Sequence, residues 1–336
     1  MQDQSLQIKR YILEAVTSHP HDIVSTAMHK FSVTSTTIHR HINSLIKDGK
    51  LSKSGSTRNT KYFLQSAYDR TKKYALNNKS AEYKMFEDFK DIFQRFPKNI
   101  YQICEFGVTE MLNNAIDHSG GTEVSIESSF IDPELIIKIQ DNGVGAFKTI
   151  CDFLETNDLR EGIVHITKGK ITRDPVNHTG QGIFFTSRVF HKFTIGANDL
   201  LYEKDNHLHD WTLVNRYGMR GTEIIMKINV HSKLTLKEVF LEYDGDDFAF
   251  AKTDILVHLA DFKESSFISR SQAKRILLGL EKFSLITLDF KKIESVGQGF
   301  VDEVFRVFAN KHPGIKIYYI NANTSVSFMI ERGVTR

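Results

Sequence analysis

Polar side chains recur at helical spacing near the middle of the sequence. Glu110, Asn114 and His118 are four residues apart, so in a helix they share one face, with Asp117 at its edge. An amide oxygen is a hard ligand of the kind Mg²⁺ prefers, and a carboxylate can orient or deprotonate a water molecule. The stretch therefore suits a magnesium-nucleotide site. On its own it is equally compatible with a solvated helix face.

Motifs at the ends of predicted strands and helices follow in order and favour the nucleotide site. They contain Asp141, Gly143 and Gly145, then Gly180 and Gly182, then Thr222. Together with the polar helix, this ordered set resembles the N box, the two glycine boxes and the final Gly-Thr of the histidine-kinase-like (GHKL) ATPase family. The resemblance covers about residues 85 to 230 and implies a two-layer α/β sandwich that binds ATP and Mg²⁺.

The resemblance implies a role for each polar residue. Asn114 would hold Mg²⁺ through its amide oxygen, and Glu110 would be the base or the water-orienting group. Asp141 would accept a hydrogen bond from the adenine amino group. The remaining polar members of the expected nucleotide site are Asp117, His118 and Thr222.

The glycines have implied roles of their own. Gly143 and Gly145 would let the backbone pass against the base without a Cβ clash. Gly180 and Gly182, at a helix start, would present amide N–H groups to the phosphates. The long segment between Gly145 and Gly180 is where the family carries a mobile lid, and long polar loops of this kind are commonly functional or disordered.

The N-terminal residues 1–65 are basic, with nine Lys or Arg against four Asp or Glu. Three short helical patterns followed by two short strands resemble a winged helix-turn-helix domain. An excess of positive charge confined to such a domain indicates an anionic partner, with DNA the first candidate. A winged helix used for protein docking or dimerisation is the alternative.

The DNA-contacting residues expected on this domain fall into two groups. Those on the outward face of the third helix can donate to phosphates and base edges, and those on the wing can follow the phosphate backbone. The candidates are Thr36, Thr37, His39, Arg40 and Ser44 on the helix, and Lys53 and Arg58 on the wing.

Residues 66–99 have a charged helical pattern and are expected to connect the N-terminal domain to an ATP-binding domain at 100–232. A sensor kinase would carry its phosphoacceptor histidine in this connector. The sequence has no histidine between His41 and His118. Histidine autophosphorylation in the usual place is therefore excluded.

Residues 240–336 alternate predicted strands and helices, which indicates a small sheet covered by helices. The block from Leu288 to Phe300 resembles a STAS-like domain related to anti-anti-sigma factors. Those proteins carry a phosphoacceptor serine at the turn where Val296 stands here, preceded by Ser295. Because valine has no hydroxyl, we expect this domain to be a docking or sensing module that binds a protein partner, and not a phosphoswitch.

The sequence thus predicts a multidomain α/β (α+β) protein: an ATP-binding, transcription-related regulator in which Mg-ATP switches the two flanking domains. A serine/threonine kinase of the anti-sigma type, and an ATP-driven clamp that dimerises, are the alternatives; ATP hydrolysis and a homodimer stay open. No apolar run approaches the ~20 residues of a membrane helix, and the N-terminus lacks the apolar core of a signal peptide. We therefore expect a cytoplasmic protein with no membrane partner.

Overall fold

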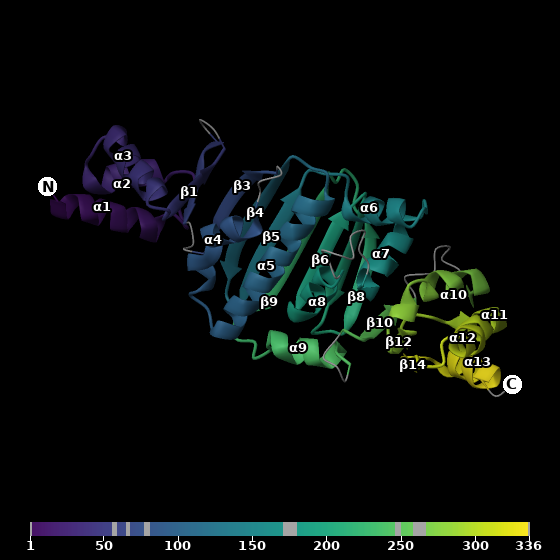
Figure 1. Cartoon of the computed structure of the whole chain (residues 1–336). Helices are drawn as coiled ribbons and strands as arrows, with labels where there is room; N and C mark the ends of the chain where they lie inside the picture. The colour runs from purple at the N-terminus through teal and green to yellow at the C-terminus, as the bar shows by residue number, and fades with distance from the viewer. Residues whose placement is uncertain are drawn as a thin grey trace. The chain divides into compact units, whose positions relative to one another are not determined.

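The computed structural model describes residues 2–55, 59–64, 68–76, 81–170, 180–245, 250–257 and 267–334 (Figure 1). The chain divides into two compact units. The first contains Met1–Thr71 with Glu127–Asp132, and the second contains Lys72–Ile126 with Pro133–Arg336. Each unit is described by itself.

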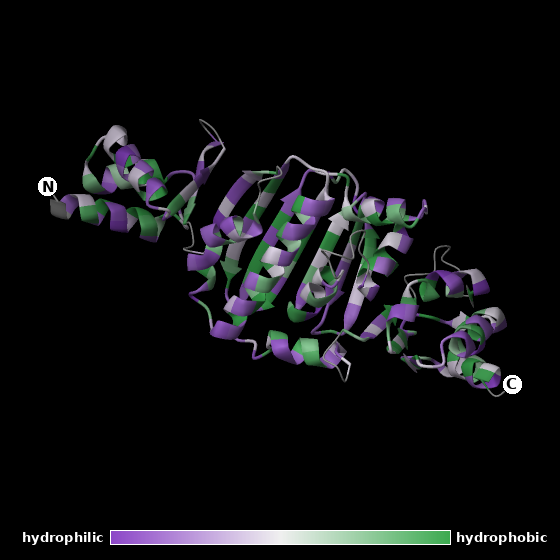
Figure 2. Ribbon diagram, in the orientation of Figure 1, coloured by the Kyte–Doolittle hydropathy of each residue, from purple (hydrophilic) through white to green (hydrophobic). Residues whose placement is uncertain are grey.

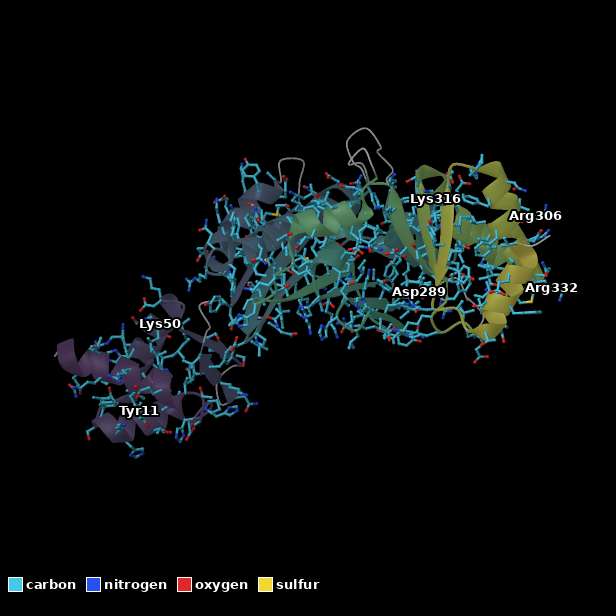
Figure 3. All side chains as sticks on the ribbon, turned by 90° about the horizontal axis from the view of Figure 1, so that it is seen from below. Tyr11, Lys50, Asp289, Arg306, Lys316 and Arg332 are labelled. Carbon is cyan, nitrogen blue, oxygen red and sulfur yellow. The ribbon has the colours of Figure 1, made fainter. Side chains whose placement is uncertain are left out.

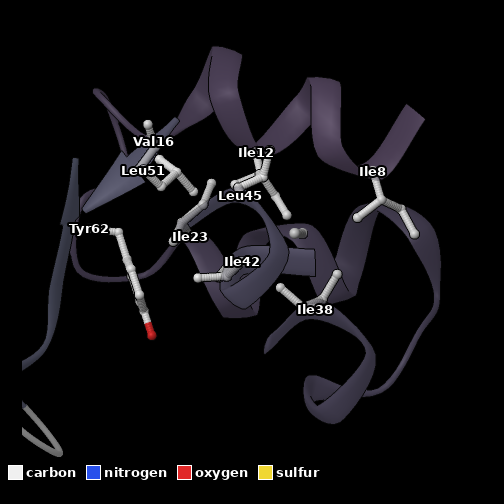
Figure 4. Close-up of a cluster of buried hydrophobic side chains, with 10 residues drawn as sticks. Ile8, Ile12, Val16, Ile23, Ile38, Ile42, Leu45, Leu51 and Tyr62 are labelled. Carbon is white, nitrogen blue, oxygen red and sulfur yellow. The ribbon is translucent and has the colours of Figure 1, made fainter. Parts of the chain in front are cut away.

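Three helices and a two-stranded hairpin make up the N-terminal part of the first unit. They are α1 (Gln2–Ala15), α2 (Ile23–Phe31), α3 (Ser35–Lys47), β1 (Leu51–Ser54) and β2 (Lys61–Leu64). The strands pair antiparallel. Apolar residues at helical spacing turn inward and form one core that also includes Leu51 and Tyr62 from the strands (Figure 4). The predicted order of three helices and a hairpin is confirmed in these residues.

The largest sheet among the described residues has seven strands, in the order β3-β4-β5-β9-β6-β7-β8. Its strands are β3 (Arg70–Ala75), β4 (Glu123–Ile131), β5 (Glu134–Asp141), β6 (Lys192–Ala197), β7 (Leu200–Asp205), β8 (Asp210–Asn215) and β9 (Thr222–Asn229). Strand β9 pairs antiparallel with both β5 and β6. Alternate residues of β5 are buried, which is the pattern of a sheet with one covered face.

Helices α4 (Glu82–Phe93), α5 (Lys98–His118) and α8 (Gly182–Val189) lie over this face of the sheet, as Figure 1 shows. Their hydrophobic residues, together with those of the strands, form the apolar layer between helices and sheet (Figure 2). Gly107 lets α5 approach closely, because a Cβ there would lie 2.4 Å from the Phe190 ring. Two layers of this kind are what the sequence predicted for this region.

The predicted helical connector at 66–99 is wrong in part. Among the described residues of this range, Arg70–Ala75 form the edge strand β3, whereas α4 and the start of α5 at Lys98 are helical. The residues of β3 are mostly basic or polar and form no apolar stripe, so its sequence resembles a solvated helix. Pairing along the sheet edge supplies the backbone hydrogen bonds, and side chains such as Lys73, which pairs with Glu123 at 2.9 Å, stay exposed.

The C-terminal residues form a small α/β fold. Its sheet has three parallel strands, β10 (Lys252–Leu256), β12 (Leu285–Asp289) and β14 (Lys316–Ile320), in the order β10-β12-β14. A second, two-stranded sheet joins β11 (Phe267–Ile268) to β13 (Ser295–Val296). The helical segments are α10 (Arg270–Leu277), η3 (Leu280–Lys282), α11 (Gln298–Val301), the π-helical η4 (Asp302–Phe308), α12 (Ala309–Lys311) and α13 (Thr324–Val334).

The outer elements of this C-terminal fold carry charged side chains beside exposed apolar ones such as Tyr318 and Phe328. Lys316, Arg306 and Arg332 project from β14, η4 and α13 in Figure 3. The alternation of strands and helices that the sequence predicts is present here. One predicted helix, 297–309, is continuous in its course but has a π-helical stretch within it.

Candidate functional site

A cavity of about 380 Å³ opens beside the polar face of α5. Eight of the residues expected at the nucleotide site line it, and they come from four separate segments. They are Glu110, Asn114, Asp117 and His118 from α5, Asp141 from the end of β5, Gly180 and Gly182 from the start of α8, and Thr222 from the start of β9. The fold therefore brings together residues that are more than a hundred positions apart in the sequence.

Asp141 is the most constrained of these residues. Its side chain is buried, and Oδ1 accepts hydrogen bonds from the backbone N–H groups of Gly143 at 2.8 Å and Thr222 at 3.2 Å. Burial raises the pKa of the Asp141 carboxyl, and the two N–H donors oppose that rise. Gly221 is required next to it, because a Cβ at this positive φ would lie 2.1 Å from the Asp141 carbonyl oxygen. The carboxylate is thus held as a fixed acceptor at the cavity wall.

Asn114 carries a polar atom that the surrounding protein does not satisfy. Its Nδ2 is buried, and no hydrogen-bond partner for it lies among the described residues. Turned about its last torsion, the same amide presents its oxygen to the cavity instead. An unpartnered buried amide carries a free-energy cost, which a polar ligand in the cavity would remove. The residues present therefore fit a polar group such as a metal-phosphate complex.

Glu110 and Gly182 are close neighbours in the lining of the cavity. A Cβ on Gly182 would come within 2.2 Å of Glu110 Oε2, so only glycine lets the carboxylate sit at the start of α8. Gly180 has a positive φ of 67°, which glycine adopts without strain. The helix start and the carboxylate thus face the same space.

Gly143 and Gly145 do not line the cavity. A Cβ on Gly143 would lie 2.1 Å from the Ser119 carbonyl oxygen, and one on Gly145 would lie 2.5 Å from Asn198 Oδ1. These two glycines let the turn after β5 pack against the end of α5 and against Asn198. The close approach that sequence reasoning assigned to a base is therefore made to protein atoms.

Asn198 is a structural residue of the site that sequence reasoning missed. Its Oδ1 accepts from the Lys148 N–H at 3.0 Å, and its Nδ2 donates to the Val144 carbonyl at 2.9 Å. These bonds fix the turn that precedes α6 (Ala146–Phe153). Asn198 has a positive φ of 51°, a conformation that asparagine tolerates better than most residues, but no spacing in the sequence links it to the turn.

The apolar part of the cavity wall was also missed. Most of it consists of isoleucines from two strands and three helices, namely Ile139, Ile150, Ile166, Ile183 and Ile224. Two of them lie on α6 and α7 (Leu159–Lys168), inside the segment that was expected to be a long polar lid. The expected lid is thus largely helical up to Lys168, and residues 171–179 lie outside the described residues. An apolar wall beside a fixed carboxylate suits a planar heterocycle.

The expected DNA-contacting residues differ in how accessible they are. Thr36, His39 and Arg40 are exposed on α3, and Lys53 is exposed on β1. Thr37 is engaged at the start of α3, where its N–H donates to Thr34 Oγ1. Arg58 lies outside the described residues.

Ser44 is engaged within the first unit. It accepts from Lys9 Nζ at 2.8 Å, and its hydroxyl donates to Asp48 at 3.4 Å. Of the expected DNA contacts among the described residues, the three exposed ones on α3 and Lys53 on β1 are therefore the ones available to a partner.

The turn expected to differ from that of anti-anti-sigma factors has no hydroxyl at the acceptor position and is closed to solvent there. Val296 is buried with 2% of its surface exposed, on a strand that pairs with β11. Ser295 is half-buried next to it. The geometry at Val296 gives a kinase nothing to phosphorylate at that position.

Comparisons with known proteins cover parts of the chain. Residues 272–327 match the family model described as a STAS-like domain of unknown function (DUF4325). The C-terminal domain is STAS-like. No curated protein matches the sequence.

Among solved structures, the chain is similar to the possible transcriptional regulator YydK from Bacillus subtilis subsp. subtilis str. 168. The identity is 13%, the match covers 69% of this chain and 97% of that chain, and the TM-score is 0.17. A superposition this loose carries no argument about fold or function. Among the described helices, none combines the length and apolar content that a membrane crossing requires.

Proposed function

We propose that this chain is an ATP-binding regulator in which Mg-ATP at the cavity switches an N-terminal DNA-binding domain and a C-terminal STAS-like docking domain. One observation carries the proposal. Eight polar and glycine residues from four distant segments, all of them expected at the nucleotide site, line a single cavity. A solvated helix face would not gather Asp141, Gly182 and Thr222 around it.

Each residue has a task that its position supports. Asp141 would accept from the adenine amino group while Gly143 and Thr222 N–H groups hold it in place. The isoleucine wall would exclude water from the base. The N–H groups at the start of α8 would face the phosphates, because the first N–H groups of a helix have no intrahelical partner.

Asn114 would hold Mg²⁺, which would neutralise phosphate charge when bound. Among the described residues, no cluster of three His, Cys, Asp or Glu side chains could hold a metal ion. The ion would therefore depend on oxygens of the nucleotide for most of its ligands. Glu110, next to Gly182, would orient or deprotonate a water molecule.

DNA binding is the output that charge and exposure favour for the N-terminal domain. Arg40 and His39 are exposed on α3, and Lys53 extends the basic surface onto the hairpin. The STAS-like domain would bind a protein partner. Nucleotide state alters either interaction only if the bound and free forms differ in affinity for the partner.

The first experiment separates nucleotide chemistry from nucleotide sensing. The full chain is incubated with Mg²⁺ and γ-labelled ATP, and label is counted as free phosphate, protein-bound phosphate and unreacted nucleotide. Asn114→Ala removes the proposed ligand, and Gln102→Ala is the control because it removes an exposed amide from the same helix outside the cavity. Release of phosphate that only Asn114→Ala abolishes supports an ATPase switch.

Other outcomes of this experiment redirect or overturn the proposal. Label on the protein supports a protein kinase of the anti-sigma type. Bound but unreacted ATP indicates a sensor without turnover. Absence of binding by the wild-type chain refutes the ATP site, and equal DNA affinity in the apo, ADP and ATP-analogue states refutes the switch.

A further inference from the structure

Helix α7 has one side in the nucleotide cavity and the other against the STAS-like domain, within the second unit. Ile166 lines the cavity, and so does Gly169 directly after the helix. Lys168 lies between them but turns the opposite way, with 1% of its surface exposed. A lysine is almost never this buried unless its ammonium group has partners.

The partners of Lys168 belong to the STAS-like domain. Its Nζ donates to the carbonyl oxygens of Arg275 at 3.2 Å and Leu278 at 3.1 Å, at the C-terminal end of α10. Carbonyl groups at a helix end have no intrahelical partner and carry partial negative charge. Lys168 therefore caps α10 from a helix that also lines the cavity.

Two more bonds tie α7 to the same domain. Thr253 Oγ1, on β10, donates to the Lys168 carbonyl at 2.7 Å. Glu161, in the first turn of α7, pairs with Arg275 at 2.8 Å. Both ends of α7 are thus held by groups from the STAS-like domain.

Helix α8 makes a parallel connection. It begins at Gly182 in the cavity and ends near Arg188, which pairs with Asp254 of β10 at 3.5 Å. Arg188 is buried beneath Phe184 and Tyr243, and Tyr243 donates to the same Asp254 at 2.8 Å. The neighbouring residues Thr253 and Asp254 therefore bond to both helices that line the cavity, Thr253 to α7 and Asp254 to α8.

We infer that α7 and α8 couple the cavity to the STAS-like domain, so that a ligand in the cavity changes the order of α10 and β10. This inference rests on the proposed function, because it needs a nucleotide in the cavity. Coupling between two sites is reciprocal, so a partner on the STAS-like domain changes nucleotide affinity by the same factor. The coupling works through α7, because a ligand that shifts Ile166 or Gly169 moves the Lys168 ammonium group that caps α10.

A second lysine supplies a matched control. Lys292 joins the STAS-like domain to the edge strand β8, where its Nζ lies 3.0 Å from Asp210 Oδ1 and donates to the Trp211 carbonyl at 3.0 Å. Asp210, Trp211 and Lys292 do not line the cavity. Lys168→Met and Lys292→Met each remove one ammonium group, with its two contacts, between the same two parts of the chain, but only Lys168 belongs to a cavity helix.

The experiment is hydrogen–deuterium exchange of the full chain with and without Mg²⁺ and a non-hydrolysable ATP analogue. Protection of residues 110–118 reports binding, and protection of residues 270–278 reports coupling. We expect the analogue to slow exchange in both regions of the wild type and of Lys292→Met. In Lys168→Met the slowing at 110–118 persists, while that at 270–278 falls by about fivefold or more.

The outcomes distinguish the two claims. Protection at 110–118 without any at 270–278 in the wild type overturns the coupling and leaves the proposed function standing. An equal α10 response in Lys168→Met and the wild type, or an equal loss in both lysine variants, also overturns it. No protection in either region overturns the proposed function and the coupling together.

A charge-reversal pair keeps the test decisive if Lys168→Met does not fold. Arg275→Glu places a second carboxylate opposite Glu161, and Glu161→Arg in the same chain restores an ion pair. We expect the single variant to weaken the α10 response and the double variant to recover it. A double variant no better than the single one counts against the coupling.

Discussion

Asp141→Asn changes one oxygen for an NH₂ group at the residue that would recognise adenine. Asp141 Oδ1 already accepts two backbone N–H groups, from Gly143 and Thr222. In the variant, the remaining amide oxygen must keep that position, because an NH₂ group there would face two donors. The NH₂ group then points where the other oxygen was, and meets the adenine amino group donor to donor.

The size of the effect follows from the lost hydrogen bond. A hydrogen bond to a charged acceptor contributes about 1.5–3 kcal/mol, and each 1.4 kcal/mol is about tenfold in Kd. We therefore expect Asp141→Asn to weaken ATP binding by about 10- to 150-fold. Inosine triphosphate carries a carbonyl where adenine has its amino group, so the variant's NH₂ group can donate to it. The preference for ATP over inosine triphosphate should shrink or reverse.

Competition titration with both nucleotides checks this, with Mg²⁺ held constant. Asp132→Asn is the control, because Asp132 is exposed in the turn between β4 and β5 and does not line the cavity. The reasoning is refuted if Asp141→Asn keeps the wild-type preference for ATP, whatever its absolute affinity. A general loss of fold would weaken both nucleotides equally, so the ratio separates recognition from stability.

Three further predictions concern catalysis, pH and DNA. A Cβ on Gly182 would lie 2.2 Å from Glu110 Oε2, so Gly182→Ala displaces the Glu110 carboxylate. The rate of phosphate release should fall by up to about 100-fold with the nucleotide Kd nearly unchanged, and an equal loss of nucleotide binding would contradict this. Burial lowers the pKa of His165 to about 3 from 6.5, so the free energy of unfolding is highest above pH 6.5 and falls by about 1.4 kcal/mol per pH unit below it, where the unfolded chain binds a proton that the folded chain does not. His165→Leu should reduce the change in melting temperature between pH 7.5 and 5, and an unchanged pH dependence would refute the assignment to His165. Arg40→Ala should cost about 1–3 kcal/mol in DNA affinity if Arg40 contacts a base, or lower the salt slope by about one if it contacts a phosphate; titration at several salt concentrations decides, and no effect on either would exclude α3 as the DNA surface.

The sequence predicts the polar half of the cavity better than the apolar half, for a physical reason. Glu110, Asn114 and Asp141 stand in short motifs, and the order of several such motifs along the sequence is enough to single them out. Ile150 and Ile166 are ordinary core residues until the fold turns them toward the cavity. Which face of α6 or α7 points inward is decided by tertiary packing, and the sequence holds no local trace of it.

The sequence also does not predict features that depend on contacts with distant residues, such as an edge strand or a buried lysine. Strand β3 was predicted as helix because its charged residues satisfy no strand pattern, and its hydrogen bonds come from a neighbour about fifty residues away. The burial of Lys168 was equally hidden. A lysine in a polar segment predicts a solvated side chain, and only the carbonyl groups at the end of α10, more than a hundred residues later, make its burial favourable.

The central place of β9 bears on how the protein is made. It is the last strand of the seven-stranded sheet to be synthesised, yet it lies between β5 and β6 and supplies Thr222 and Ile224 to the cavity. The ribosome completes the three-helix core of the first unit about 10 to 30 seconds earlier, at ~5–20 residues per second. A nascent chain therefore carries its DNA-binding candidate before it has the cavity that we propose to bind a nucleotide. A chain truncated before Thr222 would contain this domain without the proposed nucleotide site.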